Sequence, residues 1–385
     1  MSDYQPLGKP RRNQRMDGVL LGVILALTLI GVIAVYTAGS ERSELLYGSP
    51  HHMFLQHIAR SLTGLAVLMI AALVPFSTWQ RLGWPIVAAA LILLVLVFID
   101  PFSVSGKGAT RWVRFGPVSF QPSEAAKFAL VFFIASYSVK QGDAMKRFVP
   151  GVLIPMAVTG SILLMILRQP DFSTAAMIAV IAGMMLFLAG AHFGWLSLTI
   201  ITFAGAAVGA VLTSPYRRER LLTYLAPHED TMDAGYQILQ SWIGMGRGGL
   251  FGVGLGESRQ KLFFLPDAHT DFIYSVIGEE LGFIGAFLVL VLFGVLVWRG
   301  FRIAMNCPDA YGSFLAAGIT FAVGLYAVIN MAIAAGVLPT TGLPLPLISY
   351  GGTSLLITFA ALGVVLNISQ YSWPKQGARV TGGKR

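Results

Sequence analysis

The chain contains about ten separate apolar stretches, each long enough to cross the roughly 30 Å hydrocarbon core of a bilayer. They centre on residues 19–38, 57–76, 84–99, 122–139, 148–167, 172–190, 195–212, 271–298, 313–336 and 345–368. Lipid offers no hydrogen-bond partner to backbone amides and carbonyls, so a single segment can cross it only as a helix. The sequence therefore predicts an all-α polytopic membrane protein with about ten transmembrane helices.

The composition agrees with a membrane protein and excludes several other classes. Hydrophobic residues make up 55% of the chain and charged residues only 12%, whereas a soluble domain carries about 25% charged residues. The net charge of +9 is spread over loops and tails, so we expect no nucleic-acid partner. A single cysteine, Cys307, excludes an internal disulfide, and the six histidines show no metal-ligand spacing, so we expect no metal centre built from these residues.

The distribution of basic residues predicts the topology. An even number of spans leaves both termini on one side, and that side carries Lys9, Arg11, Arg12, Arg15, Lys140, Lys146, Arg147, Arg299, Arg302, Lys375, Arg379, Lys384 and Arg385. The positive-inside rule makes this side cytoplasmic. We therefore expect a cytoplasmic tail at residues 1–17, a transmembrane domain at 18–370 and a second cytoplasmic tail at 371–385. The first span is longer than the apolar part of a signal peptide, so we expect it to remain.

Two longer loops are left for the opposite, extracytoplasmic face. One covers about residues 213–270, between the seventh and eighth spans, and the other about residues 100–121. Both are basic, through Lys107, Arg111, Arg114, Arg217, Arg218, Arg220, Arg247, Arg259 and Lys261. Long translocated loops escape the charge rule, so these residues are either an ordinary solvated surface or a site for an anionic ligand.

The segment KLFFLPDAHTDFIYSVIGEELGF, residues 261–283, places Asp271 where a polar loop enters the eighth span. An acid at a membrane boundary is costly when unpaired, so it is a candidate functional residue. An acid beginning a helix is also a common cap. A capping carboxylate is rigidly held and can still act as a general base. We therefore keep both roles for Asp271, with His269 beside it as a candidate for substrate contact.

For other polar residues along the chain, both a purely structural role and a functional role have to be considered. Glu279 and Glu280 lie deeper in the eighth span, and we expect them to be buried hydrogen-bonding residues. Glu124 and Lys127 are three residues apart, so we expect them to pair, although Lys127 also stays a substrate-binding candidate. Arg168 and Asp171 should pair or face the site across a short turn. Arg111 has no acid nearby in sequence, so it is a candidate ligand-binding residue.

Two further segments are unusual in composition. Three prolines between Pro339 and Pro346 predict non-helical backbone at the outer boundary, which is tolerated only where protein or a water-filled cavity covers it. We therefore expect a cavity wall there and count Ser349 as a substrate-binding candidate. The glycine-rich segment 244–258 follows no strand and lacks a GK[ST] ending, so it does not indicate a nucleotide site. Its glycines instead favour close packing or loop motion.

Several segments taken together resemble one protein family. They read TRWVRFGPVSFQPSEAAK, RQPDFSTA, GYQILQSWIGMGRGGLFGVGLG, KLFFLPDAHTDFIYSVIGEELGFIG and LPLPLISYGGTSLL. In this order and spacing the chain resembles the SEDS proteins (shape, elongation, division and sporulation), the FtsW/RodA/SpoVE group. The segment QKLFFLPDAHTDF is more similar to FtsW than to RodA. Asp267 stands where members usually have Glu, and Thr341 where many division-type members have Lys.

The resemblance implies a peptidoglycan glycosyltransferase that polymerises lipid II at the outer face of the cytoplasmic membrane during cell division. It implies a class B penicillin-binding protein as transpeptidase partner, together with other division proteins, and it maps the family's catalytic acid onto Asp271. The leaving pyrophosphate requires positive charge, for which Arg111 and Arg217, Arg218 or Arg220 are candidates. No cofactor is required, although a divalent cation such as Mg²⁺ or Mn²⁺ is compatible with this chemistry.

Three alternatives remain open from sequence. The first is a lipid II flippase, because ten helices, an intramembrane Glu279 and Lys127, and proline-broken backbone are typical of transporters. The second is an elongation polymerase of the RodA type. The third is a non-catalytic scaffold of the division complex, in which Asp271 would only cap a helix.

Overall fold

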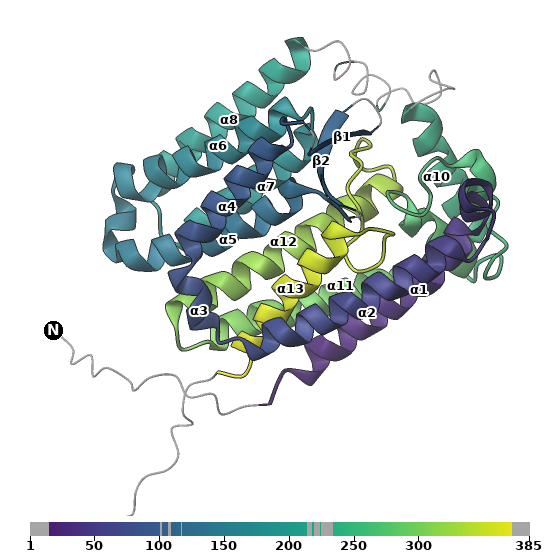
Figure 1. The fold of residues 1–385 in the computed structure, drawn as a ribbon, viewed down its shortest axis with the longest axis horizontal. Coiled ribbons are helices and arrows are strands. Elements are labelled where there is room, and N and C mark those ends of the chain that lie inside the picture. Colours follow the sequence, from purple (N-terminus) through teal and green to yellow (C-terminus); the bar gives the residue numbers. More distant parts are fainter. Residues whose placement is uncertain are drawn as a thin grey trace, which may run out of the picture.

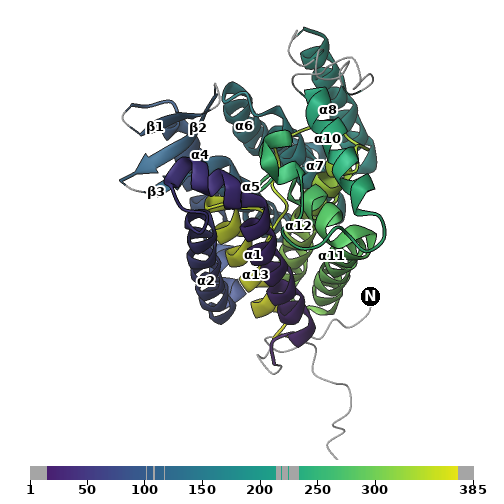
Figure 2. The same cartoon turned by 90° about the vertical axis from the view of Figure 1, so that its right-hand side faces the viewer.

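The computed structural model describes residues 15–371 except 101, 107–108, 117, 214–217, 219–223 and 225–233. Within these ranges the chain is a bundle of helices that run side by side, with a small sheet at one end (Figures 1 and 2). The helices are α1 (Gly18–Tyr47), α2 (His52–Leu73), α3 (Phe76–Arg81), α4 (Gly83–Leu96), α5 (Pro122–Gln141), α6 (Ile154–Arg168), α7 (Phe172–Leu188), α8 (Phe193–Thr213), α10 (Ala234–Gly248), α11 (Ile273–Asn306), α12 (Ala310–Ala334) and α13 (Thr353–Ile368). Short 3-10 or π turns cover Gly142–Lys146 (η1), Val149–Leu153 (η2) and Gln260–Phe264 (η3).

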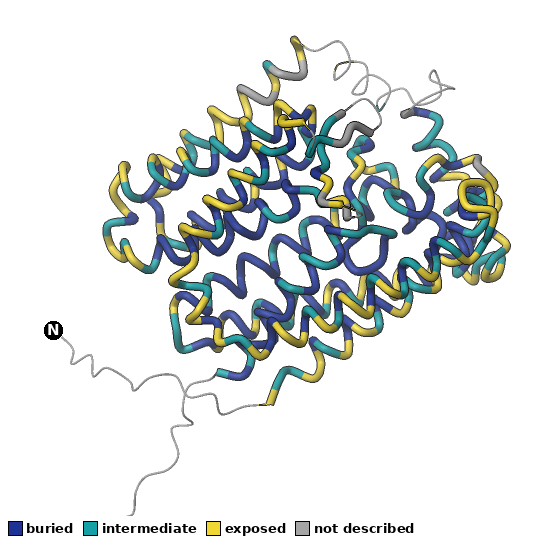
Figure 3. Tube along the Cα trace, in the orientation of Figure 1, coloured by how far each residue is buried: buried dark blue, intermediate teal, exposed yellow. Residues whose placement is uncertain are grey.

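Each apolar stretch of the sequence contains one of these helices, which confirms the predicted polytopic α-helical fold. Among the described residues, five helices are long and apolar enough to cross a membrane, and four more are apolar but shorter. Helix α5 differs from these because Glu124 and Lys127 interrupt its apolar sequence. It is buried on nearly every face from Pro122 to Ser138, since α4, α7 and α12 pack around it (Figure 3).

The two ends of the described chain meet at one end of the bundle. The backbone N–H of Asp17 donates to Ser369 Oγ at 3.1 Å. Arg299 Nε, near the end of α11, donates to both carboxylate oxygens of Asp17 at 2.8 and 3.0 Å. Asp17 also caps α1 by accepting from the N–H of Leu20 at 2.9 Å. The N-terminal end of the first span and the C-terminal end of the last span therefore lie on the same side of the bundle, as an even number of crossings requires.

The two long loops, at about residues 100–121 and 213–270, contain secondary structure that the sequence did not predict. Strands β1 (Ser103–Gly106), β2 (Ala109–Phe115) and β3 (Val118–Phe120) form an antiparallel sheet in the order β1-β2-β3. The predicted loop 213–270 contains α10 and η3. The all-α prediction is confirmed for the bundle, and the sequence missed only these short elements, because a short strand or a short helix contains no apolar stretch of spanning length.

The last span also starts later than predicted. Helix α13 begins at Thr353, whereas the apolar stretch begins at 345. Residues 335–352, which we call the proline loop, are non-helical except for the turn at the end of α12. Gly342 and Leu347 have left-handed backbone at φ 72° and 65°, which explains why the apolar sequence there does not continue a helix. The expected non-helical backbone at the prolines is confirmed.

Candidate functional site

The residues His269, Thr270 and Asp271, called the HTD segment, are fixed through their backbone. Each of the three successive carbonyl groups accepts a hydrogen bond from the α12–proline loop region: His269 from Tyr350 N–H at 3.0 Å, Thr270 from Ser349 Oγ at 2.5 Å, and Asp271 from Asn330 Nδ2 at 2.9 Å. The Asp271 N–H donates to the carbonyl of Asp267 at 3.1 Å. These contacts hold the backbone that carries the Asp271 carboxylate in one position.

The donors that hold the segment are themselves anchored. Asn330 is 1% exposed, and its Nδ2 also donates to the Leu343 carbonyl at 2.7 Å. Ser349 is 4% exposed, and its hydroxyl accepts from the Leu345 N–H at 2.8 Å while it donates to Thr270. Ser349 was expected to contact substrate, but both functions of its hydroxyl are already used inside the protein. Its role in this structure is to position the HTD segment.

The Asp271 carboxylate lies between the start of α11 and the proline loop. A Cβ built at Gly342 would come within 3.6 Å of Asp271 Oδ2, so the proline loop passes close to this oxygen. Helix α11 begins at Ile273, and its N-cap residue is Phe272, whose side chain makes no capping hydrogen bond. Asp271 therefore lies one residue before the N-cap position, which Phe272 occupies. Asp271 is partly exposed, so its carboxylate is within reach of a ligand.

His269 is part of a polar cluster that extends into α2. Its ring lies 5.6 Å from the ring of Tyr350, centroid to centroid. The Tyr350 hydroxyl donates to Gln56 Oε1 at 2.7 Å, and Arg60 Nη2 donates to the same oxygen at 3.1 Å. The Arg60 guanidinium lies 4.9 Å above the Tyr350 ring. Burial raises the pKa of Tyr350 above its usual value, so this phenol stays protonated and keeps donating.

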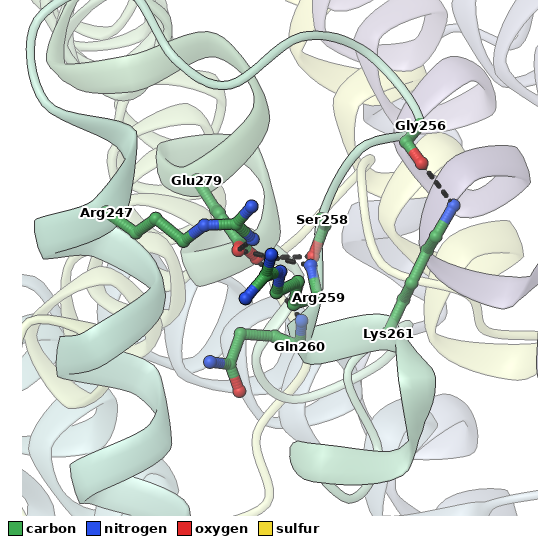
Figure 4. Close-up of polar contacts among 7 residues, drawn as sticks. All are labelled: Arg247, Gly256, Ser258, Arg259, Gln260, Lys261 and Glu279. Atoms are coloured by element: carbon green, nitrogen blue, oxygen red, sulfur yellow. Dashed lines mark hydrogen bonds and ion pairs between the residues drawn. The ribbon is translucent and has the colours of Figure 1, made fainter.

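Glu279 organises the loop that leads to the HTD segment (Figure 4). Its side chain is fully buried, and Arg247 Nη1 donates to its Oε1 at 2.8 Å. The Ser258 hydroxyl and the backbone N–H groups of Arg259 and Gln260 donate to the same carboxylate, the last two at 3.1 and 3.4 Å. We call these five residues the Glu279 node. One buried acid thus joins α10, α11 and the loop before η3, so its charge is compensated within the protein.

Helix α11 is broken at Gly282, where the backbone has φ 69° and ψ −167°. The glycine-rich segment after α10 fills this break. The N–H groups of Phe283 and Ile284 donate to the carbonyls of residues 249 and 250 at 2.8 and 3.2 Å. In return, the carbonyls of Glu279 and Glu280 accept from the N–H groups of residues 253 and 254 at 3.0 and 3.1 Å. Four backbone groups released by the break therefore have partners in this segment.

Glycine is required where these two segments meet. A Cβ at Gly248 would collide with the carbonyl of Gly278, and a Cβ at Gly252 would collide with that of Glu280. Gly252 and Gly282 also have positive φ values of 83° and 69°. The glycines therefore serve close backbone packing, which is one of the two roles expected from the sequence.

The expected pair in α5 is present. Lys127 Nζ donates to Glu124 Oε2 at 2.9 Å, and their side chains are 4% and 3% exposed. Lys127 Nζ also lies 3.8 Å from the ring centroid of Tyr326. The ammonium group is thus enclosed by an acid and an aromatic face, which places Lys127 in a structural pair and not at an open binding surface.

Arg111 connects the sheet to the turn between α6 and α7. Its Nε donates to the Gln169 carbonyl at 3.1 Å and its Nη2 to the Pro170 carbonyl at 2.5 Å. Two of the five guanidinium donors are thus used on backbone. In the same turn, Asp171 caps α7 by accepting from the Thr174 N–H at 3.2 Å.

The ion pair considered for Arg168 and Asp171 is not among the salt bridges of the residues that the structure describes. The reason is that the Asp171 carboxylate is turned toward the first turn of α7, whereas Arg168 is exposed. Arg218 is also exposed, and Arg217 and Arg220 lie outside the described residues. Within the described ranges, no group of three or more His, Cys, Asp or Glu residues could hold a metal ion.

The sequence pattern that defines the FtsW/RodA/SpoVE family of cell cycle proteins matches residues 18–373. This chain belongs to that family. A Geobacter sulfurreducens relative named "Probable peptidoglycan glycosyltransferase FtsW" is 42% identical over 362 residues, covering 92% of this chain and 95% of the relative. Stage V sporulation protein E of Bacillus subtilis is 39% identical over 359 residues, covering 92% and 97%.

Solved structures of family members show the same fold. A chain from a peptidoglycan synthase complex that coordinates polymerization and crosslinking superposes with a TM-score of 0.76 at 28% identity, covering 92% of this chain and 97% of that one. The rod shape determining protein RodA of Thermus thermophilus superposes with a TM-score of 0.67 at 26% identity, covering 92% and 96%. The matches extend over nearly the whole membrane domain, so they include the HTD segment, α11 and the proline loop.

Sequence reasoning missed several residues around the HTD segment. Asn330 and Tyr350 are separated from it by tens of residues, and nothing local marks them as its partners. Arg60 and Arg42 could have been singled out from the sequence. Each lies in a long apolar helix, where an unpaired charge is costly. Both lie near the HTD segment in this member of the family, at Tyr350 and Asp267 respectively.

Proposed function

We propose that this protein is a peptidoglycan glycosyltransferase that polymerises lipid II, with the Asp271 carboxylate as general base. The observation that carries the proposal is the fixing of three successive carbonyls at residues 269–271, which places one partly exposed acid at the loop–helix junction. A general base works best when its position is set before substrate arrives. The names and the high coverage of the family relatives support the same activity.

In this reaction an acceptor sugar hydroxyl attacks the anomeric carbon of the donor. Asp271 takes the hydroxyl proton as the new carbon–oxygen bond forms. The bond from the anomeric carbon to the diphosphate breaks, and the diphosphate leaves with the electron pair. A single displacement inverts the anomeric centre and needs no covalent intermediate on the protein. The acid has to stand next to the acceptor hydroxyl, which suits a carboxylate beside an open loop.

The departing diphosphate needs positive charge nearby. Arg111 keeps three N–H donors beyond the two used on backbone carbonyls, so it remains a candidate for this role. Arg218 is exposed on the same extracytoplasmic loop system, with Arg217 and Arg220 as its sequence neighbours. A divalent cation such as Mg²⁺ or Mn²⁺, bound with the diphosphate, would supply the same stabilisation.

The proposed orientation puts both termini in the cytoplasm and the HTD segment at the outer face of the cytoplasmic membrane. Basic residues near the ends of the bundle support it. We propose a class B penicillin-binding protein as the transpeptidase partner, since a similar structure belongs to a complex that couples polymerization to crosslinking. The resemblance to FtsW favours cell division over elongation as the process served.

The flippase alternative is less well supported. Transporters use broken helices to expose backbone groups to ions or substrate near the membrane centre. Here residues 249–254 of the same chain already use four backbone groups at the break near Gly282, which leaves these four closed to a transported ligand. A pure scaffold would not need a partly exposed acid on backbone that three hydrogen bonds hold in place.

The test is glycan synthesis from labelled lipid II by the purified protein with its transpeptidase partner, whose own active site is blocked. We expect the protein to form polymer. If the reaction needs no divalent cation, polymer should also form in the presence of a chelator. Liposomes that contain the protein and fluorescent lipid II provide the parallel flippase assay. Lipid transport across the bilayer without any polymer would contradict the proposal and favour the transporter.

A further inference from the structure

A cavity of about 180 Å³ lies beside the HTD segment, between α1 and the loop around η3. The function proposed above gives it no role. Its apolar part is formed by Ala38, Leu265 and Ala268, and its polar part by Arg42, Lys261 and Asp267, with His269 at its inner edge. We call it the α1 pocket. It adjoins the backbone that positions Asp271, so a ligand in it would lie close to the reacting groups.

Arg42 is the group in this pocket that most needs a partner. Its side chain is 38% exposed, and the acid it pairs with among the described residues is Asp267, whose Oδ1 lies 3.6 Å from Arg42 Nη1. That distance is longer than a hydrogen bond. Among the described residues, no hydrogen bond uses the Arg42 guanidinium, so all five of its N–H donors remain available. A planar set of donors at a pocket mouth suits the oxygens of a phosphate.

Lys261 adds a second cation from a different part of the chain. Its Nζ donates to the Gly256 carbonyl and lines the same pocket. Arg42 comes from α1 and Lys261 from η3, so the two charges are brought together only by the fold. Lys261 also interacts electrostatically with Glu280, so Arg42 is the cation of the pocket that remains for an anion at the membrane boundary.

Exposed apolar side chains flank the pocket residues Arg42 and Lys261 in the sequence. Leu262 and Phe264 of η3 are 46% and 48% exposed, and Leu45 and Leu46 of α1, one turn beyond Arg42, are 72% and 58% exposed. Exposed apolar side chains around a cationic centre fit an amphipathic ligand, whose anionic group enters the pocket while its hydrocarbon chain stays in the bilayer. A free inorganic anion would gain nothing from these apolar side chains.

We propose that the α1 pocket binds the diphosphate of a polyprenyl-linked saccharide, with Arg42 and Lys261 donating to its oxygens. The inference rests on the proposed function, because polymerisation brings two lipid-linked molecules to one carboxylate and each carries its own diphosphate. Arg111 lies on the sheet, at the turn between α6 and α7, and serves one of them. The α1 pocket gives the other a separate place. Arg42 is thus a substrate-binding residue and takes no proton.

The test measures binding of a radiolabelled polyprenyl pyrophosphate to the purified protein in detergent, without turnover. Arg42→Ala should weaken binding by about tenfold or more, since a charge-assisted hydrogen bond is lost. Arg42→Lys should lie between this variant and the wild type, because it keeps the charge and loses the planar donor set. Lys146→Ala is the matched control, since it removes an exposed cation beyond the far end of α5. Arg42→Ala binding within about twofold of wild type would overturn the proposal.

Competition distinguishes the sources of the anion. Unlabelled polyprenyl pyrophosphate should displace the probe at lower concentration than inorganic pyrophosphate or phosphatidylglycerol in mixed micelles. Equal displacement by inorganic pyrophosphate would show a general anion site and refute the lipid-linked ligand. Equal displacement by phosphatidylglycerol would make this a site for bulk membrane lipid, which also contradicts the proposal.

Kinetics separate this proposal from the proposed function. Arg42→Ala should raise the KM for lipid II more than it lowers kcat, whereas Asp271→Asn should lower kcat. If Arg42→Ala still polymerises lipid II with unchanged binding and KM, the α1 pocket is not a diphosphate site. The glycosyltransferase activity proposed for the protein would then still stand. Binding that depends on Arg42, in a protein that makes no polymer with its partner, would refute the function while the anion site stands.

Discussion

Replacing Glu279 by Ala should release the loop that precedes the HTD segment. The substitution removes the acceptor for Arg247, the Ser258 hydroxyl and two backbone N–H groups. Arg247 is 33% exposed and can turn to solvent, so the loss of its ion pair with Glu279 contributes little to the destabilisation. The hydroxyl of Ser258 and the N–H of Gln260 belong to buried residues, and each costs about 1–3 kcal/mol when left unsatisfied. The loop should therefore become less stable by about 2–6 kcal/mol.

Limited proteolysis measures this directly, because trypsin cleaves after Arg259 and Lys261 within the loop. When opening is fast compared with cleavage, the cleavage rate follows the population of the open loop. A loss of 2–6 kcal/mol then predicts a rise of roughly 30-fold or more at these two sites. Glu257→Ala is the matched control, since it removes an exposed acid of the same loop and should leave the rate unchanged. A Glu279→Ala rate within about threefold of the control would refute the assigned role of the Glu279 node.

Three further changes test other parts of the structure. Gly282→Ala places a Cβ against the backbone of the segment after α10, at a residue whose φ is 69°. The peak of folded protein in detergent size-exclusion chromatography should therefore be largely lost. Gly294→Ala, which points into open space on the same helix, should leave this peak unchanged. Asn330→Leu removes the donor to the Asp271 and Leu343 carbonyls, so the melting temperature should fall, and polymerisation per folded protein should fall by about tenfold or more; unchanged activity would contradict the positioning role. Lys127→Met alone should destabilise by about 3–5 kcal/mol in chemical denaturation, and adding Glu124→Gln should recover most of it; strict additivity would show that the pair is not coupled.

The sequence predicted those features of the fold that depend on local hydropathy. Each long apolar stretch became a helix, because lipid gives a lone segment no other way to satisfy its backbone. The proline loop was also expected, since Pro339 to Pro346 cannot continue a helix. The Glu124–Lys127 pair followed from spacing alone, because residues three apart on a helix lie on the same face.

The features that the sequence did not predict depend on contacts between distant segments. The break of α11 lies at Gly282 within an uninterrupted apolar helix pattern, and its compensation by residues 249–254 appears only in three dimensions. The same holds for Asn330, whose amide reaches Asp271 across 59 positions of the chain. The start of α11 at Ile273 was missed for a related reason, since the turn before it is held by tertiary contacts.

The most direct test of the central claim compares the wild type with Asp271→Asn in glycan synthesis from labelled lipid II, each with the blocked transpeptidase partner. The amide is nearly isosteric and cannot take the acceptor proton, so the backbone contacts of residues 269–271 should persist and thermal melts should match. We predict a fall in the rate of polymerisation of about 10²-fold or more. Polymer formation by Asp271→Asn at the wild-type rate would contradict the assignment of Asp271 as general base.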